Sequence, residues 1–231
     1  MYRLKYQSKV ANAGVNFTKM ENTTNHQTQK KHIIIGLTGP MAAGKNAAAD
    51  ILSTMGYACV DADILAHDAI EKAKTQILNI FANQAKSASL TLLNKDGTIN
   101  RKSLAILVFK NQKNLTAQEA IIHPIVNTMI EEFIQNNSDK SIVINATVLY
   151  KVSAIKKCTA IFFVTAPVLT RLKRAKKRDN HSTLHILKRF WSQHGLFSKY
   201  VSINSDTYKV KNLGSLKDLR KNITKVLSLL K

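Results

Sequence analysis

The chain has 231 residues, of which 45% are hydrophobic and 21% charged, and its formal net charge is +21. This length can bury one α/β core with an inserted subdomain, and the hydrophobic fraction excludes wholesale disorder. Cys59 and Cys158 lie far apart in apolar runs, which excludes a disulfide framework and predicts reduced thiols in a cytoplasmic protein. No apolar run reaches the roughly 18 residues of a membrane span.

The first 31 residues differ in composition from the rest of the chain. They are polar and aperiodic, and include Asn22-Thr23-Thr24-Asn25. We predict a disordered polar N-terminal extension over residues 1–31 and assign it no function. Met20 offers an alternative start site.

A phosphate-binding loop is predicted directly after this extension. Three isoleucines, Ile33–Ile35, predict a short buried strand, and the helix former Ala47-Ala48-Ala49 follows the loop. Between them, Gly39 and Gly44-Lys45 match G-x-x-x-x-G-K, in which glycines let backbone N–H groups approach a phosphate and the lysine follows the β- and γ-phosphates. The helix N-terminus also favours an anion. The predicted nucleotide-binding residues are Gly39, Pro40, Met41, Ala42, Ala43, Gly44, Lys45, Asn46 and Ala47.

Asn46 departs from this motif, because a Ser or Thr normally ligates Mg²⁺ at its position. The amide oxygen of Asn46 remains the candidate metal ligand. The alternative interpretation is a glycine-bearing turn with a chance lysine. The order of strand, loop, lysine and helix argues against that alternative.

Two carboxylates follow the next predicted strand, Tyr57–Val60. Asp61 and Asp63 therefore lie at the carboxyl end of a strand, where open α/β sheets bind ligands. They could serve metal binding or general-base catalysis. Alternatively, Asp61 caps the helix that continues from Ile64 and Asp63 is its first-turn acid. Beside a phosphate loop, we favour a catalytic function for Asp61.

A long helical stretch, interrupted by a turn at Asn94–Gly97, extends to about Asn137. Asn100 can cap a helix through Phe109, and residues 117–135 predict a helix that is broken or kinked near His123-Pro124. Strands are then expected at Ser141–Ile144 and Ala160–Val164. Such an insertion is a plausible substrate lobe.

A basic segment follows, in which Arg171, Arg174 and Arg178 share one helical face. Such cations can close over a polyphosphate, although a solvated face is the alternative. A helix over Ser182–His194, a strand over Thr207–Val210 and a closing helix over Ser215–Leu230 complete the chain. The net charge could serve nucleic acid or acidic small molecules, and the absence of a readable DNA-binding motif favours the second.

The chain resembles the dephospho-coenzyme A kinase family over roughly residues 33–231. The matching stretches are Ile35–Gly39 with the loop through Lys45, Val60–Asp63 with His67, Asp96–Arg101 with Leu104, Val108-Phe109, His123-Pro124, Arg171-Leu172, Arg178-Asp179, Arg189, Gln193, Ser205-Asp206 and Asn212–Leu216. The resemblance implies a three-layer α/β/α P-loop kinase fold, similar to adenylate kinase, with a parallel five-stranded sheet, a helical substrate-binding insertion and a lid. The expected core is 32–62, 140–168 and 203–231, the substrate domain about 63–139, and the lid about 169–200.

The same resemblance implies an activity and residue roles. The activity is ATP-dependent phosphorylation of the ribose 3′-hydroxyl of dephospho-CoA, the last step of coenzyme A synthesis. Asp61 would accept the hydroxyl proton, Lys45 would hold ATP, and Arg174 or Arg178 would close over its phosphates. The acceptor would be bound by Asp63, His67, Arg101 and His123, with ATP and Mg²⁺ as cofactors.

Some positions depart from the family pattern. Ala42-Ala43 replace the usual Gly-Ser, and Ala146–Lys151 lacks the proline and acid of the family's apolar segment. Two alternatives are therefore kept: a P-loop kinase of another nucleotide-like alcohol, and a degenerate ATP-binding scaffold. The sequence leaves the oligomeric state open.

Overall fold

The computed structural model describes residues 32–178, 186–187, 190–191, 193, 195–202 and 206–230. All of them belong to one unit, His32–Lys231. The predicted extension at 1–31, and most of the helix predicted over Ser182–His194, lie outside the described residues.

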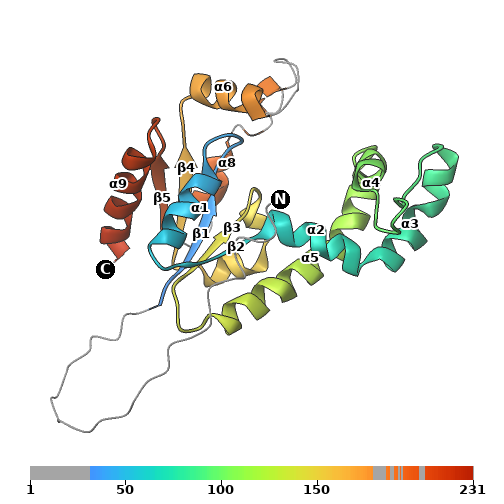
Figure 1. Cartoon of the computed structure of the whole chain (residues 1–231), viewed down its shortest axis with the longest axis horizontal. Helices are drawn as coiled ribbons and strands as arrows, with labels where there is room; N and C mark the ends of the chain where they lie inside the picture. The colour runs from blue at the N-terminus through green and yellow to red at the C-terminus, as the bar shows by residue number, and fades with distance from the viewer. Residues whose placement is uncertain are drawn as a thin grey trace, which may run out of the picture. The chain divides into compact units, whose positions relative to one another are not determined.

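Five parallel strands form the central sheet. They are β1 (Ile34–Thr38), β2 (Ala58–Asp61), β3 (Ile142–Asn145), β4 (Ala160–Thr165) and β5 (Asp206–Lys211). Their order is β2-β3-β1-β4-β5 (Figure 1). The predicted strands are confirmed, with ends that differ by up to three residues. In the pairing register Asn145 lies opposite both Leu37 and Asp61, so the carboxyl ends of β1, β2 and β3 meet at one edge.

Helices cover both faces of this sheet, because successive strand residues point to opposite sides. On one face, α1 (Lys45–Thr54) and α9 (Leu216–Leu227) bury Leu52 and Leu219 with Leu37, Val143 and Phe162. The other face packs against α2 (Ala62–Lys72), α5 (Gln112–Asn136) and α8 (Leu196–Val201). The predicted three-layer α/β/α fold is confirmed.

The helices between β2 and β3 form a helical insertion, residues 62–137. Besides α2 and α5 it contains α3 (Lys74–Ser87) and α4 (Arg101–Val108), packed around Phe81 and Leu107. Asn100 caps α4 by accepting the N–H of Ser103, as predicted. Helix α5 starts at Gln112, earlier than expected, because Asn111 caps it.

Pro124 does not break α5, which continues through it to Asn136. A proline inside a helix loses one backbone hydrogen bond and usually kinks or ends the helix. Here Ile122 and Val126 are buried on either side of it. Packing of this apolar face therefore holds the helix together where local propensity alone would end it.

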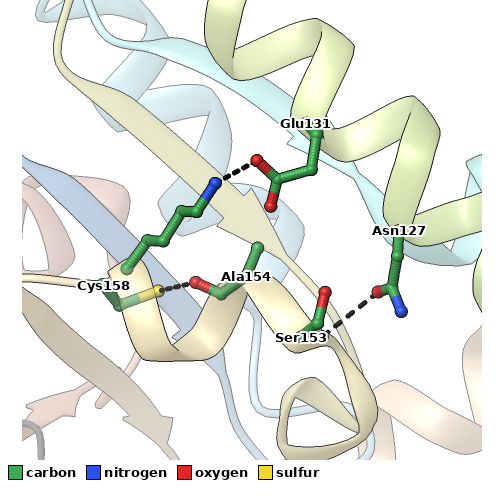
Figure 2. Close-up of polar contacts among 6 residues, drawn as sticks. Asn127, Glu131, Ser153, Ala154 and Cys158 are labelled. Carbon is green, nitrogen blue, oxygen red and sulfur yellow. Dashed lines mark hydrogen bonds and ion pairs between the residues drawn. The ribbon is translucent and has the colours of Figure 1, made fainter.

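The segment after β3 is bound to α5 by a hydrogen bond and an ion pair. It contains two 3₁₀ turns, η1 (Leu149–Lys151) and η2 (Ser153–Lys157). Figure 2 shows the Ser153 N–H donating to Asn127 Oδ1 (3.1 Å) and the ion pair from η2 to Glu131, whose cation is Lys157. These contacts hold η2 against α5.

One further helix, α6, follows β4 along the chain. Helix α6 spans Val168–Arg178, and α8 follows Gly195, whose φ of 75° is left-handed. In the described part of the chain, no helix combines the length and the apolar character that crossing a bilayer requires.

Candidate active site

The predicted phosphate loop joins β1 to α1 through Gly39–Gly44. Gly39 and Gly44 have φ angles of 150° and 99°. A Cβ on Gly39 would collide with the carbonyl of Val164, and one on Gly44 with the side-chain amide of Asn212. Both glycines are therefore required by backbone conformation and by close approach.

Side chains from the opposite half of the sheet hold the loop's backbone. The carbonyl of Ala43 accepts hydrogen bonds from Asn212 Nδ2 (2.8 Å) and Arg174 Nη1 (3.4 Å). Arg174 Nη2 also donates to Asn212 Oδ1 (3.4 Å). The predicted cation Arg174 therefore lies directly against the loop.

A second cation, Arg171, contacts Met41, two residues before Ala43 in the loop. Its Nε donates to the Met41 carbonyl (2.8 Å), while the Met41 N–H donates to Gln193 Oε1 (2.8 Å). The guanidinium of Arg171 stacks on the ring of Phe190, 4.1 Å from its centroid. Arg171 is only 8% exposed, its burial lowers its pKa, and its Nη2 has no partner among the described residues. An unpaired buried donor costs about 1–3 kcal/mol, so packing alone does not explain an arginine here.

Lys45, at the start of α1, points to the carboxylates. Its Nζ donates to Thr147 Oγ1 (3.4 Å), and that hydroxyl donates to Asp63 Oδ2 (2.6 Å). Burial lowers the pKa of Lys45, the charges of Asp63 and Asp61 oppose this, and Arg178 lowers it further. The structure thus brings the loop lysine and both predicted carboxylates together.

Asp61 is the N-cap of α2, one of the two alternatives that the sequence left open, and it also lies at the carboxyl edge of the sheet. Its Oδ1 accepts the N–H groups of Asp63 (2.9 Å) and Ile64 (3.3 Å), which makes it the N-cap of α2. Its Oδ2 accepts a hydrogen bond from Asn145 Nδ2 (2.8 Å). Burial, and then the charge of Asp63, raise the pKa of Asp61. The carboxylate is therefore a cap and also a perturbed group at the ligand-binding edge of the sheet.

The remaining predicted residues lie on the helical insertion. His67 and Arg101 are exposed on α2 and at the start of α4, and His123 is half-buried in α5. None of the hydrogen bonds among the described residues joins these three to Lys45 or Asp61. Their side chains contribute to the site only if an acceptor molecule reaches them.

Residues missed from the sequence complete the site. Asn145 donates to Asp61 and, at 3.2 Å, to Asn46 Oδ1, and Thr147 links Lys45 to Asp63. Asn145 ends a strand at the carboxyl edge, so the rule that identified Asp61 could also have found it. Arg171 and Asn212 were singled out from the sequence, but their contacts with loop carbonyls were not predicted, because no motif specifies such contacts.

The oxygen ligands at this edge fit Mg²⁺. Asp61, Asp63 and the exposed Asn46 offer carboxylate and amide oxygens, and Asn145 Oδ1 is buried with no partner among the described residues. Among the described residues, no group of three or more Asp, Glu, His or Cys side chains is placed so that it could hold a metal ion by itself. Mg²⁺ bound to nucleotides keeps several waters and needs only one or two carboxylates besides the phosphates. The ligand set therefore suits a nucleotide-borne Mg²⁺.

A glycine-rich loop that leads from a parallel strand into a helix, with its lysine linked through Thr147 to a carboxylate that follows β2, is typical of the class of P-loop kinases. Comparison with known proteins identifies the member of this class. The sequence profile of the family described as dephospho-CoA kinase matches residues 33–217. The dephospho-CoA kinase of Treponema denticola is 39% identical over 195 residues, 83% of this chain and 87% of that protein. The chain belongs to the dephospho-CoA kinase family.

Solved structures agree with this fold. A protein from Thermus thermophilus superposes with a TM-score of 0.72 at 28% identity, covering 87% of this chain and 100% of that one. The dephospho-CoA kinase of Campylobacter jejuni superposes with a TM-score of 0.57 at 24% identity, covering 87% of this chain and 98% of that one.

Proposed function

We propose that the chain transfers the γ-phosphoryl group of ATP to the ribose 3′-hydroxyl of dephospho-CoA, releasing coenzyme A and ADP. Family membership supports this substrate pair. The observation that carries the proposal is the link from Lys45 through Thr147 to Asp63, beside Asp61. It places the ammonium of Lys45, a phosphate-binding cation, close to carboxylates that can accept a hydrogen bond from the acceptor hydroxyl.

On the donor side, the loop residues Gly39–Ala47 bind the polyphosphate through backbone N–H groups and the N-terminus of α1. The ammonium of Lys45 binds the β- and γ-phosphates, and Arg174 and Arg178 on α6 neutralise charge as the phosphoryl group moves. The contact of Arg174 with Ala43 and the electrostatic effect of Arg178 on Lys45 support these roles. We assign α6 to a lid spanning about residues 169–200.

On the acceptor side, Asp61 accepts the proton of the 3′-hydroxyl as its oxygen attacks the γ-phosphorus. A general base works best when its pKa approaches the operating pH, and the raised pKa of Asp61 supports this role. Asn145 holds the carboxylate through Oδ2. Asp63, His67, Arg101 and His123 bind the rest of the acceptor, within a substrate domain of about residues 63–139.

Asn46 and the nearby carboxylates would hold Mg²⁺, and the ion would supply positive charge that neutralises the β- and γ-phosphates. The side-chain oxygen of Asn46 is one bond further from the backbone than a serine hydroxyl, so a water can lie between it and the metal. We place the reaction in the cytoplasm, with ATP and dephospho-CoA as partners and no nucleic acid.

The proposal is tested by measuring ADP release with an acceptor panel. We expect turnover with dephospho-CoA and ATP that far exceeds turnover with adenosine or other nucleosides. Greater activity on another alcohol would favour the alternative kinase. Binding of ATP without ADP release on any acceptor would favour a degenerate scaffold.

A further inference from the structure

The phosphate loop contains a residue in an unfavourable conformation. Ala42 has φ 59°, and among the described residues only Ala42 and Ser89 combine a side chain with a positive φ. The left-handed region is costly for an L-residue with a Cβ and nearly free for glycine. Something outside residue 42 must therefore keep the loop in this conformation.

Ala42 is the third residue of a β-turn. The N–H of Ala43 donates to the carbonyl of Pro40 (3.1 Å), which closes the turn over Pro40–Ala43. A positive φ at the third residue but not the second is the type II geometry, in which glycine is preferred at that position. The type I turn gives the third residue a negative φ that suits alanine. The two forms differ mainly by a flip of the central peptide, here Met41–Ala42.

Arg171 contacts this central peptide. Its Nε donates to the Met41 carbonyl at 2.8 Å, and Gln193 holds the Met41 N–H on the other side of the residue. A flip of the peptide would point the carbonyl away and break the hydrogen bond from Nε. In a trans peptide the N–H of Ala42 points opposite to the Met41 carbonyl, hence away from Arg171.

We propose that Arg171 is a positioning residue that selects the orientation of the Met41–Ala42 peptide and so keeps the Ala42 N–H available for phosphate. The alternative is that Arg171 only packs against Phe190. That alternative explains neither its hydrogen bond to Met41 nor the positive φ of Ala42. The inference rests on the proposed function only in requiring the loop to bind a nucleotide phosphate.

A double-mutant cycle with Arg171→Met and Ala42→Gly tests the proposal, with ADP and Mg²⁺ titrated by calorimetry. Without the hydrogen bond from Nε, the conformational penalty on Ala42 lowers the fraction of molecules whose turn has the phosphate-binding form. The apparent affinity for ADP falls in proportion to that fraction. We expect Arg171→Met to weaken ADP binding roughly tenfold, about 1.4 kcal/mol. Ala42→Gly removes that penalty, so we expect the double variant to recover to within about threefold of wild type.

Lys173→Met provides the matched control, because Lys173 is exposed on the same helix and carries the same charge. It should leave ADP binding unchanged. If Arg171→Met unfolds, Arg171→Lys replaces the Nε–H by a methylene while keeping the stem and the charge. The same cycle is then measured with that variant.

The proposal is overturned if Ala42→Gly fails to rescue the Arg171 variant, if that variant binds ADP as wild type does, or if the wild type does not bind ADP. Turnover of the wild type with dephospho-CoA is measured in parallel. Rescue of ADP binding without turnover would sink the proposed function and leave this inference standing. Turnover without rescue would overturn this inference and leave the proposed function standing.

Discussion

Two buried asparagines show how the carboxyl edge of the sheet, which we propose as the catalytic edge, differs from the helical insertion. Asn114, in the insertion, donates to Gln84 Oε1 (2.7 Å) and to the Leu107 carbonyl (2.8 Å), and ties α5 to α3 and α4. Asn145, at the end of β3, also donates twice, but both acceptors are site residues, Asp61 and Asn46. Its own Oδ1 is buried without a partner among the described residues. Buried polar groups are normally paired, so an unpaired one calls for a functional explanation.

The comparison extends to charge. At the catalytic edge, burial lowers the pKa of Lys45 and raises that of Asp61. Because the pKa of folded Asp61 lies above its ordinary value of 3.8, its ionisation opposes folding. The penalty is absent below the pKa of Asp61 in the unfolded chain and fully present above its raised pKa in the folded chain. The contribution of Asp61 to the free energy of unfolding therefore falls as pH rises between these two values. The active site thus costs stability at neutral pH.

The largest effect expected is that of Asp61→Asn. Loss of the general base should lower kcat by about 10²–10⁴-fold, with much smaller changes in KM. Asparagine is also a good N-cap, so α2 should be retained, and Tm at pH 7 should stay level or rise because a destabilising charge is gone. Steady-state kinetics and thermal melts measure both. If Asp63→Asn is the severe change and Asp61→Asn the mild one, the roles of the two carboxylates are exchanged.

The two asparagines should respond differently to alanine. Asn114→Ala should lower stability by about 1–3 kcal/mol, because it leaves buried acceptors unpaired, and should leave turnover of the folded enzyme unchanged. Asn145→Ala should lower turnover by about tenfold or more with a smaller loss of stability, because the amide of Asn145 holds the Asp61 carboxylate in place. Denaturant unfolding and kinetics on both variants test this. If Asn114→Ala and Asn145→Ala lose the same stability and have the same turnover, the two regions do not differ in the way described.

The smallest effect concerns Asn46. Asn46→Ser should lower the Mg²⁺ concentration for half-maximal rate by a few-fold, because a hydroxyl ligates the ion without an intervening water. The change should not alter the contact between Lys45 and Thr147. The measurement is a Mg²⁺ titration of turnover at saturating ATP. An equal or higher Mg²⁺ requirement in the serine variant would show that Asn46 is already a competent ligand.

The sequence predicted the features that have local or periodic signals. The phosphate loop, the strands, the cap at Asn100 and the position of Asp61 all follow from spacing and residue type, and the fold prediction is confirmed. The helix of α5 was predicted, but a break at Pro124 was wrong, because burial of Ile122 and Val126 outweighs the local cost of the proline. Side-chain contacts between distant segments, such as Arg171 with Met41, depend on tertiary packing and leave no spacing in the sequence.

We expect phosphoryl transfer to a ribose hydroxyl to take place between Lys45 and Asp61. The most direct test incubates the wild type with ATP, Mg²⁺ and dephospho-CoA and locates the new phosphate by ³¹P NMR of the product. We predict a 3′-phosphomonoester formed in step with ADP, and its near absence with Asp61→Asn. Free phosphate without an ester, or an ester formed equally well by Asp61→Asn, would contradict the claim.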